Sequence, residues 1–122
     1  MTKLRRRAMW SALLAFTFVM QMANISIAQE PTKTIEIHAH RFSFDPAEID
    51  LKKGETVKLR LISDDVAHSL VVSGLKINAP MIKSHPTDIT VTPERAGDFK
   101  GQCGKFCGSG HGSMIFTVHV KD

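Results

Sequence analysis

The chain of 122 residues is poor in several residue types. It has no tyrosine and one tryptophan, Trp10, and it has two cysteines, Cys103 and Cys107. Residues 1–28 contain no acidic side chain but four of the 16 basic ones, so residues 29–122 carry 12 side chains of each sign. After residue 28 no apolar stretch is longer than a few residues, which excludes a membrane-spanning helix there. The charge balance of residues 29–122 also argues against a nucleic-acid-binding role.

Residues 1–28 have the pattern of a secretory signal peptide: a basic start, an apolar run over residues 8–23 and a small-residue motif that ends at Ala28. We expect cleavage after Ala28 and a periplasmic or otherwise exported location. An uncleaved membrane anchor is the alternative, although Gln21 and Asn24 interrupt the apolar run and leave fewer than the roughly 20 continuous apolar residues of a spanning helix. Residues 29–122 then form one domain, with enough chain for one core.

The rest of the chain favours strands over helices. Apolar and polar residues alternate through residues 34–40 and 55–61, as in strands with one buried and one exposed face. Short segments rich in Val, Ile and Thr recur between Gly and Pro residues, and no segment shows helical periodicity. The sequence therefore predicts an all-β fold, an antiparallel sandwich of about seven strands. The expected strands are residues 34–40, 48–52, 55–61, 69–73, 88–92, 98–102 and 115–120.

A glycine-rich segment near the end of the chain contains the residues that point to chemistry. Five of the eight glycines lie between Gly101 and Gly112, a density that suits a tight loop better than a strand. The segment also holds two thiols, an imidazole and a thioether, a soft donor set that suits copper better than magnesium or calcium. These donors are Cys103, Cys107, His111 and Met114. His68 is the best candidate for a further ligand, because it follows a turn and enters an apolar strand.

Each of these residues also has a structural interpretation. In an exported protein the two cysteines could form a disulfide, although a bridge across three residues closes a small loop and stabilises little. A zinc site could use two Cys and one His, but a thioether is a rare zinc ligand. Met114 alone could be a core residue, and His68 a hydrogen-bonded residue at a strand edge. The combined C-x3-C-x3-H-x2-M spacing favours a copper loop over the disulfide.

Four segments together resemble the cupredoxin-fold domains that hold a binuclear copper centre, CuA, in cytochrome c oxidase subunit II and in nitrous-oxide reductase. They are FSFDP (residues 42–46), KKGETV (52–57), DVAHS (65–69) and GDFKGQCGKFCGSGHGSM (97–114). The last segment is highly specific, whereas the others are ordinary cupredoxin features. The resemblance covers most of the chain after residue 28. It implies a Greek-key β-sandwich of about seven to eight strands with copper at one end.

The resemblance also implies the copper ligands. The side-chain ligands are His68, Cys103, Cys107, His111 and Met114. The two thiolates would bridge two copper ions. His68 and Met114 would complete one ion, and His111 with the backbone carbonyl of Lys105 would complete the other. The family usually has Glu at the Lys105 position, but the expected ligand there is the main-chain oxygen. No ligand role is expected for the other histidines, which are His38, His40, His85 and His119.

Two coppers that share two sulfurs spread one electron over both metals, so each bond changes little on electron transfer. Because the sequence shows no general base or substrate pocket, we expect an electron carrier and not an enzyme. The expected partner is a redox protein such as a c-type cytochrome or a terminal reductase. The absence of Trp and Tyr from residues 29–122, and Lys105 in place of Glu, favour a free-standing domain over an oxidase subunit. Copper storage or delivery, and an anchored subunit II of a terminal oxidase, are the alternatives.

Overall fold

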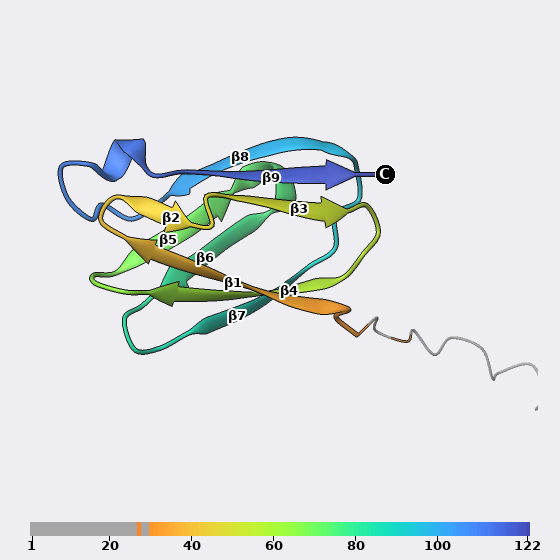
Figure 1. Ribbon diagram of the computed structural model, residues 1–122, viewed down its shortest axis with the longest axis horizontal. Coiled ribbons are helices and arrows are strands. Elements are labelled where there is room, and N and C mark those ends of the chain that lie inside the picture. Colours follow the sequence, from red (N-terminus) through yellow and green to blue (C-terminus); the bar gives the residue numbers. More distant parts are fainter. Residues whose placement is uncertain (1–26, 28–29) are drawn as a thin grey trace, which may run out of the picture.

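The structure, a computed structural model, describes residue 27 and residues 30–122, so the predicted signal peptide and its cleavage site fall outside the described residues except for Ile27. The described chain forms nine strands and two short 3-10 helices (Figure 1). The strands are β1 (Lys33–His40), β2 (Ser43–Asp45), β3 (Glu48–Lys52), β4 (Val57–Ser63), β5 (His68–Val72), β6 (Ile77–Met81), β7 (Thr87–Val91), β8 (Gly97–Cys103) and β9 (Ile115–Lys121). The 3-10 helices are η1 (Ser73–Leu75) and η2 (His111–Ser113).

The strands form a sandwich of two sheets. The four-stranded sheet has the order β2-β1-β4-β7, and the five-stranded sheet has the order β3-β9-β8-β5-β6. The predicted all-β fold is confirmed. The expectation of an antiparallel sandwich is wrong in part, because β1 pairs with β4 and β3 pairs with β9 in parallel. Parallel neighbours need a long connection between them, and local alternation carries no signal of that connection.

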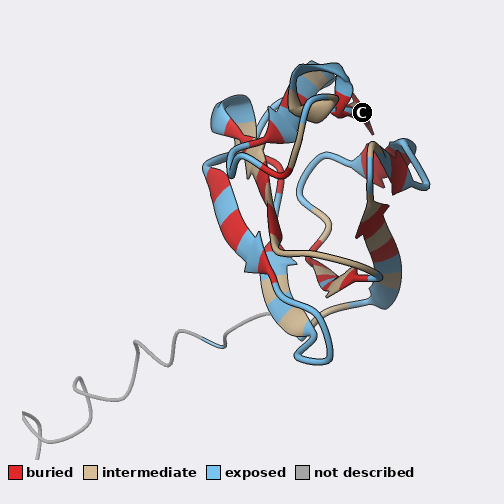
Figure 2. Cartoon of the chain, turned by 90° about the vertical axis from the view of Figure 1, so that its left-hand side faces the viewer, coloured by how far each residue is buried: buried red, intermediate tan, exposed pale blue. Residues whose placement is uncertain are grey.

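Alternating side chains explain where the core lies. Val57, Leu59 and Leu61 of β4 are buried, and the residues between them are half-buried or exposed, as predicted. Figure 2 shows the same pattern as alternating red and blue bands along the strands. The inward side chains of the two sheets meet in one core, where Phe44 of β2 and Phe116 of β9 pack edge to face with ring centroids 5.7 Å apart. Full burial of one such side chain stabilises the fold by about 1.5–3 kcal/mol.

Two strands, β2 and β6, are absent from the sequence prediction. β2 has three residues, too few to show alternation. β6 contains Asn78 and Pro80, and both residue types are depleted in strands. Pro80 is tolerated because β6 is an edge strand of the five-stranded sheet, where a missing backbone N–H leaves no neighbour unpaired.

One end of the sandwich, at the left of Figure 1 and toward the viewer in Figure 2, holds the connections that join β1 to β2, β4 to β5, β6 to β7 and β8 to β9. We call this end the loop end, and residues 104–114, which join β8 to β9 and contain η2, the donor loop. The motifs that contain Cys, His and Met therefore lie at one end of the fold. Among the described residues, no helix has the length and apolar character needed to cross a bilayer.

Candidate metal centre

His68 and Cys103 are neighbours because strands β5 and β8 pair. Leu70 of β5 lies opposite Cys103 of β8, and His68 shares the face of Leu70 because it lies two residues earlier. That face points into the core, where His68 is 1% exposed and Cys103 is 2% exposed. The sheet thus places an imidazole beside a thiol that lies 35 residues away in the sequence.

The donor loop packs tightly against Phe42, which belongs to the connection between β1 and β2. A Cβ atom at Gly110 would collide with the Phe42 ring, and one at Gly108 would lie 2.9 Å from it. Gly108 also has a φ of +139°, which other residues rarely adopt. At its base the loop is closed by a hydrogen bond from the backbone N–H of Cys103 to the carbonyl of Met114. The glycines therefore let the loop approach an aromatic ring and fix its path.

The structure brings the two cysteines and two of the histidines into one cluster. The Sγ atoms of Cys103 and Cys107 lie 3.9 Å apart. Nδ1 of His68 is 3.8 Å from the Cys103 sulfur, and Nδ1 of His111 is 3.7 Å from the Cys107 sulfur. Each sulfur atom therefore faces one imidazole nitrogen.

The remaining two predicted ligands lie in the same cluster. The carbonyl oxygen of Lys105 is 3.1 Å from the Cys103 sulfur. Sδ of Met114, whose side chain is fully buried, is 3.4 Å from the Cys107 sulfur. All six residues predicted from the sequence thus converge at the loop end.

The geometry and the donor types fit copper. Both cysteines are free thiols, and their separation is far longer than a disulfide bond of about 2.05 Å. With a metal–thiolate bond of about 2.3 Å, one ion can contact both sulfur atoms across this gap. Thiolate, thioether and imidazole together form the soft donor set that copper sites use.

Asp65 fixes the orientation of His68. Its Oδ1 lies 2.8 Å from Nε2 of His68, which leaves Nδ1 to face Cys103. A carboxylate on the far nitrogen sets the tautomer and the orientation of a metal-binding histidine. Asp65 also accepts hydrogen bonds from the backbone N–H groups of Arg41 and Val66. Partial burial acts to raise the pKa of Asp65, but the hydrogen bonds from His68 and these two backbone groups outweigh it and lower the pKa to about 2.

Arg41 supports the donor loop from outside. Its Nε donates a hydrogen bond of 3.0 Å to the carbonyl oxygen of Cys107. Burial raises the pKa of the Cys107 thiol, and the hydrogen bond and charge of Cys103 raise it further, whereas the Arg41 charge lowers it. Because the thiolate is the form that binds metal, a metal must displace a proton here, and binding weakens at low pH.

The other histidines have hydrogen-bond partners within the protein. Both ring nitrogens of His38 contact carboxylates, Nδ1 that of Asp64 and Nε2 that of Glu36, each at 2.8 Å. The remaining three also have hydrogen-bond partners: His40, His85 and His119. In the part of the chain that the structure describes, one group of three or more His, Cys, Asp or Glu residues has converging ligand atoms, and it consists of His68, Cys103 and Cys107.

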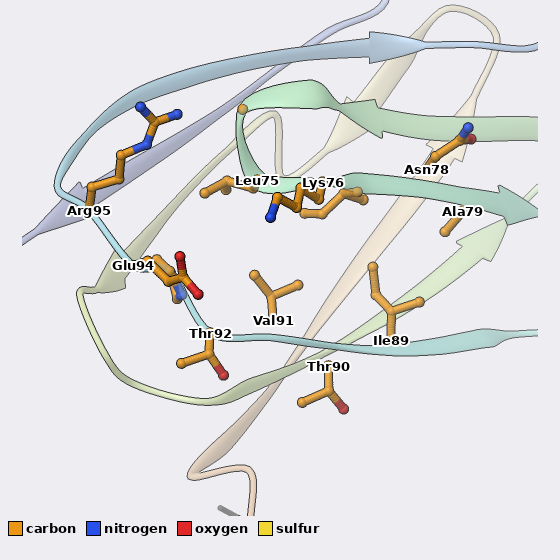
Figure 3. A pocket seen from close by; sticks show the side chains of 13 residues that line it. Leu75, Lys76, Asn78, Ala79, Ile89, Thr90, Val91, Thr92, Glu94 and Arg95 are labelled. Carbon is orange, nitrogen blue, oxygen red and sulfur yellow. The ribbon is translucent and has the colours of Figure 1, made fainter.

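Two hollows of the described surface differ in chemistry. The smaller, of about 350 Å³, borders the donor loop, and we call it the loop hollow. Its lining residues are Arg41, Val66, Ala67, Lys105, Phe106, Cys107 and Gly108. The larger, of about 590 Å³, lies between the edge strands β6 and β7, with Ile89 and Val91 pointing into it (Figure 3). Its lining contains no Cys, His or Met, so the larger hollow has none of the soft donors that favour copper.

The sequence prediction missed the residues that hold the ligands in place: Asp65, Arg41 and Phe42. Asp65 has a local signal, since it lies three residues before His68 in the DVAHS segment and carboxylates commonly orient ligand histidines. Arg41 and Phe42 have no local signal, because the donor-loop residues that they contact lie more than 60 positions later in the sequence. Cys107 lies 66 positions after Arg41.

Comparisons with known proteins point to the same fold. The cupredoxin-like domain family matches residues 10–116. Cytochrome c oxidase subunit 2 of Thermus thermophilus is 29% identical over 89 residues, which are 73% of this chain and 66% of that protein. A second Thermus thermophilus protein of the same name is also 29% identical, and the chain spans 53% of it. The chain thus covers less than two thirds of the length of these relatives.

Solved structures show the same architecture. The periplasmic domain of cytochrome oxidase subunit II (CoxB) of Bradyrhizobium japonicum superposes with a TM-score of 0.71 at 15% identity, over 79% of this chain and 88% of that one. A mixed disulfide between the thioredoxin-like TlpA and CoxB superposes with a TM-score of 0.66 at 15% identity, over 78% and 86%. At these identities the likeness shows the fold. Because the family match covers most of the chain and the two-sheet sandwich agrees with it, the chain belongs to the cupredoxin-like domain family.

Proposed function

We propose that this protein is a periplasmic electron carrier that passes single electrons through a binuclear, CuA-type copper centre. The observation that carries the proposal is the pair of unbonded sulfur atoms 3.9 Å apart, each facing an imidazole nitrogen. Mononuclear blue-copper sites use one thiolate with two imidazoles and a weak axial ligand. A second thiolate in the same cluster supports two ions that share both sulfurs.

The residues of the chain have separate roles in this proposal. Cys103 and Cys107 would hold the copper ions together with the side chains of His68, His111 and Met114 and the backbone carbonyl of Lys105. When bound, the copper centre supplies a one-electron couple. The buried His68 and Met114 side chains keep water from the centre, and the hydrogen bond from Asp65 holds the His68 ring in one orientation. Ligands fixed in this way need little rearrangement when an electron moves.

A second candidate function is the electron-entry subunit of a terminal oxidase, held at the membrane by an uncleaved residue 1–28 segment. Its support is the similarity to cytochrome c oxidase subunit 2 of Thermus thermophilus. Sequencing of the amino terminus of the exported protein separates the two candidates. A mature chain that starts at Gln29 contradicts the anchored subunit, and retention of residues 1–28 supports it.

The two thiols must be reduced before they can bind metal, so a thiol reductant is a plausible partner in an oxidising compartment. The mixed disulfide formed between CoxB and a thioredoxin-like protein supports this partner class. The partner in electron transfer would be a redox protein such as a c-type cytochrome or a terminal reductase.

Copper loading of the purified, reduced protein tests the proposed function. Native mass spectrometry measures the number of copper ions per chain, and voltammetry measures electron exchange. We expect two ions per chain and a reversible one-electron wave. One ion per chain would contradict the binuclear centre. Ready transfer of copper to a metal-free acceptor without a reversible wave would contradict electron relay and favour copper delivery.

A further inference from the structure

Phe106 is an apolar side chain exposed beside a predicted copper ligand. It is 77% exposed, whereas the other phenylalanines of the described chain are buried or half-buried. Its ring centroid lies 5.7 Å from that of His111, whose Nδ1 faces the Cys107 sulfur. A molecule that packs on Phe106 is therefore separated from the proposed copper centre by the rings of Phe106 and His111.

The loop hollow beside Phe106 carries positive charge. Its lining includes Arg41 and Lys105 and no acidic residue. Among the ion pairs of the described residues, none involves either cation, and the guanidinium of Arg41 is bound through Nε to a backbone carbonyl. The hollow thus presents two cations without an ion-pair partner among the described residues, beside an apolar ring.

The two acidic residues of the neighbouring connection between β4 and β5 do not line the hollow, and each faces a histidine. Asp64 contacts Nδ1 of His38 at 2.8 Å. Asp65 accepts hydrogen bonds from His68 and from two backbone N–H groups. The charged side chains that line the hollow itself are therefore Arg41 and Lys105.

We propose that the loop hollow docks the acidic face of a redox protein. Phe106 makes the central apolar contact, and Arg41 and Lys105 pair with carboxylates that surround the redox group of the partner. The proposal rests on the proposed function, since the contact serves to pass one electron between the copper centre and the partner, so that one is oxidised as the other is reduced. Small contacts of this kind are typical of transient electron-transfer complexes.

Charge complementarity is the reason to expect an acidic partner. Residues 29–122 carry 12 charges of each sign, so the domain as a whole does not attract either kind of partner strongly. A local pair of cations beside an exposed aromatic ring then decides orientation and encounter rate, because complementary charge steers association more than it adds affinity. The same pair disfavours a partner with a basic docking face.

The first test uses the metal-free protein, so it does not depend on copper. Two paramagnetic complexes of opposite charge, hexacyanochromate(III) and tris(ethylenediamine)chromium(III), are added to the nitrogen-15-labelled protein. We expect the anion to broaden the amide signals of residues 66–67 and 105–108 at low salt, and the cation to leave them sharp. Broadening by the cation at these residues, or uniform broadening by the anion, would overturn the basic docking surface.

Lys105→Glu and Lys33→Glu form a matched pair for this test. Both reverse one charge, but Lys33 begins β1 and lies at the end of the sandwich opposite the donor loop. Lys105→Glu changes only the side chain, so the backbone carbonyl at this position still faces the centre. We expect Lys105→Glu to weaken anion binding at the hollow about fivefold, because the substitution removes an attractive charge and adds a repulsive one. Lys33→Glu should leave anion binding at the hollow unchanged. Equal effects of the two variants would contradict the proposal.

The second test uses protein partners. Binding of acidic cytochrome b5 and of basic cytochrome c is followed by amide chemical shifts, and electron exchange with the copper-loaded protein is followed by stopped flow. We expect cytochrome b5 to shift the loop-hollow signals, to exchange electrons more slowly as salt rises, and to bind Phe106→Ser more weakly than Phe106→Leu. If electrons are exchanged with cytochrome c but not with cytochrome b5, and Lys105→Glu does not change that rate, the proposal of an acidic partner is wrong. The proposed function would still stand. Binding of cytochrome b5 without any electron exchange would instead contradict the proposed function.

Discussion

His68 and His119 lie in different environments and use their rings differently. His68 begins β5 at the loop end, is 1% exposed, and binds one carboxylate through Nε2 while Nδ1 faces a thiol. His119 lies near the end of β9, far from the donor loop along that strand, and both of its ring nitrogens contact carboxylates. Nδ1 lies 2.7 Å from Asp98 and Nε2 lies 3.5 Å from Glu48.

The difference separates a predicted ligand histidine from a structural one. A histidine can bind a metal when one nitrogen is held by the protein and the other is left for the ion. His119 has no nitrogen left, and its contacts join β8, β9 and β3 across the surface. His38 resembles His119, since Asp64 and Glu36 occupy both of its nitrogens. The partner of each ring nitrogen therefore tells more about function than the residue type alone.

The largest expected effect is the difference in copper content and visible spectrum between the matched variants His68→Gln and His119→Gln. We expect His68→Gln to abolish the binuclear spectrum, because an amide does not replace a buried imidazole ligand to copper. His119→Gln should retain the copper content and the spectrum of the parent protein. Copper stoichiometry and the visible spectrum of both loaded variants measure this. A binuclear spectrum in the loaded His68→Gln protein would contradict the ligand role of His68.

Asp65→Asn should weaken copper binding about 10–100-fold, the usual loss when the outer partner of a ligand histidine is changed. The amide leaves the shape of the side chain nearly unchanged but removes the charge that orients and polarises the His68 ring. Copper affinity is measured by competition with a chelator of known affinity. Asp64→Asn is the matched control, because the neighbouring carboxylate contacts His38 and not a predicted ligand. Similar losses in the two variants would show that net charge, not orientation, is responsible.

Gly110→Ala should destabilise the protein by about 1–3 kcal/mol, the usual range for overpacking, because the new Cβ collides with the Phe42 ring. Gly112→Ala is the control within the same loop, since a Cβ there meets no atom within 4 Å. Chemical denaturation of the metal-free proteins measures the difference. If the two variants unfold at the same denaturant concentration, Phe42 does not fix the path of the donor loop.

The smallest expected effect is a pH-dependent contribution of His119 to the free energy of unfolding. Its hydrogen bond with Asp98 is the main cause that raises its pKa above the ordinary value of 6.5. A raised pKa in the folded state stabilises the fold at pH below about 6.5, and this contribution disappears as the pH rises through the folded-state pKa. We therefore expect the free energy of unfolding to differ more between the parent and His119→Gln at about pH 5.5 than at about pH 8.5. A larger difference at high pH would contradict this account.

The sequence could predict which donors cluster because most of them are local in the chain. Five of the six predicted ligands, the Lys105 carbonyl among them, lie within the segment from Cys103 to Met114, and the turn before His68 marks where it enters a strand. The parts that sequence reasoning missed depend on contacts between distant segments. Arg41 meets Cys107 across 66 residues, and Phe42 meets the glycines of the donor loop across a similar distance.

The same distinction applies to the fold. Alternation and residue composition together predict seven of the strands, with ends that differ by a few residues. The parallel pairing of β1 with β4 depends instead on the path of the chain between them. β6 escapes prediction because Asn78 and Pro80 oppose its local propensity, and its place at the edge of the sheet tolerates them. The larger hollow beside β6 shows that volume alone does not mark the site, since its lining lacks every soft donor.

Electron paramagnetic resonance of the copper-loaded protein tests the central claim most directly. An unpaired electron shared by two copper nuclei gives a hyperfine pattern that differs in line number and spacing from that of one nucleus. We predict the two-nucleus pattern in the parent protein and its loss in Cys107→Ser, which removes one of the two sulfur atoms now 3.9 Å apart. A one-nucleus pattern in the fully loaded parent protein, or a parent-like pattern in Cys107→Ser, would contradict the binuclear centre.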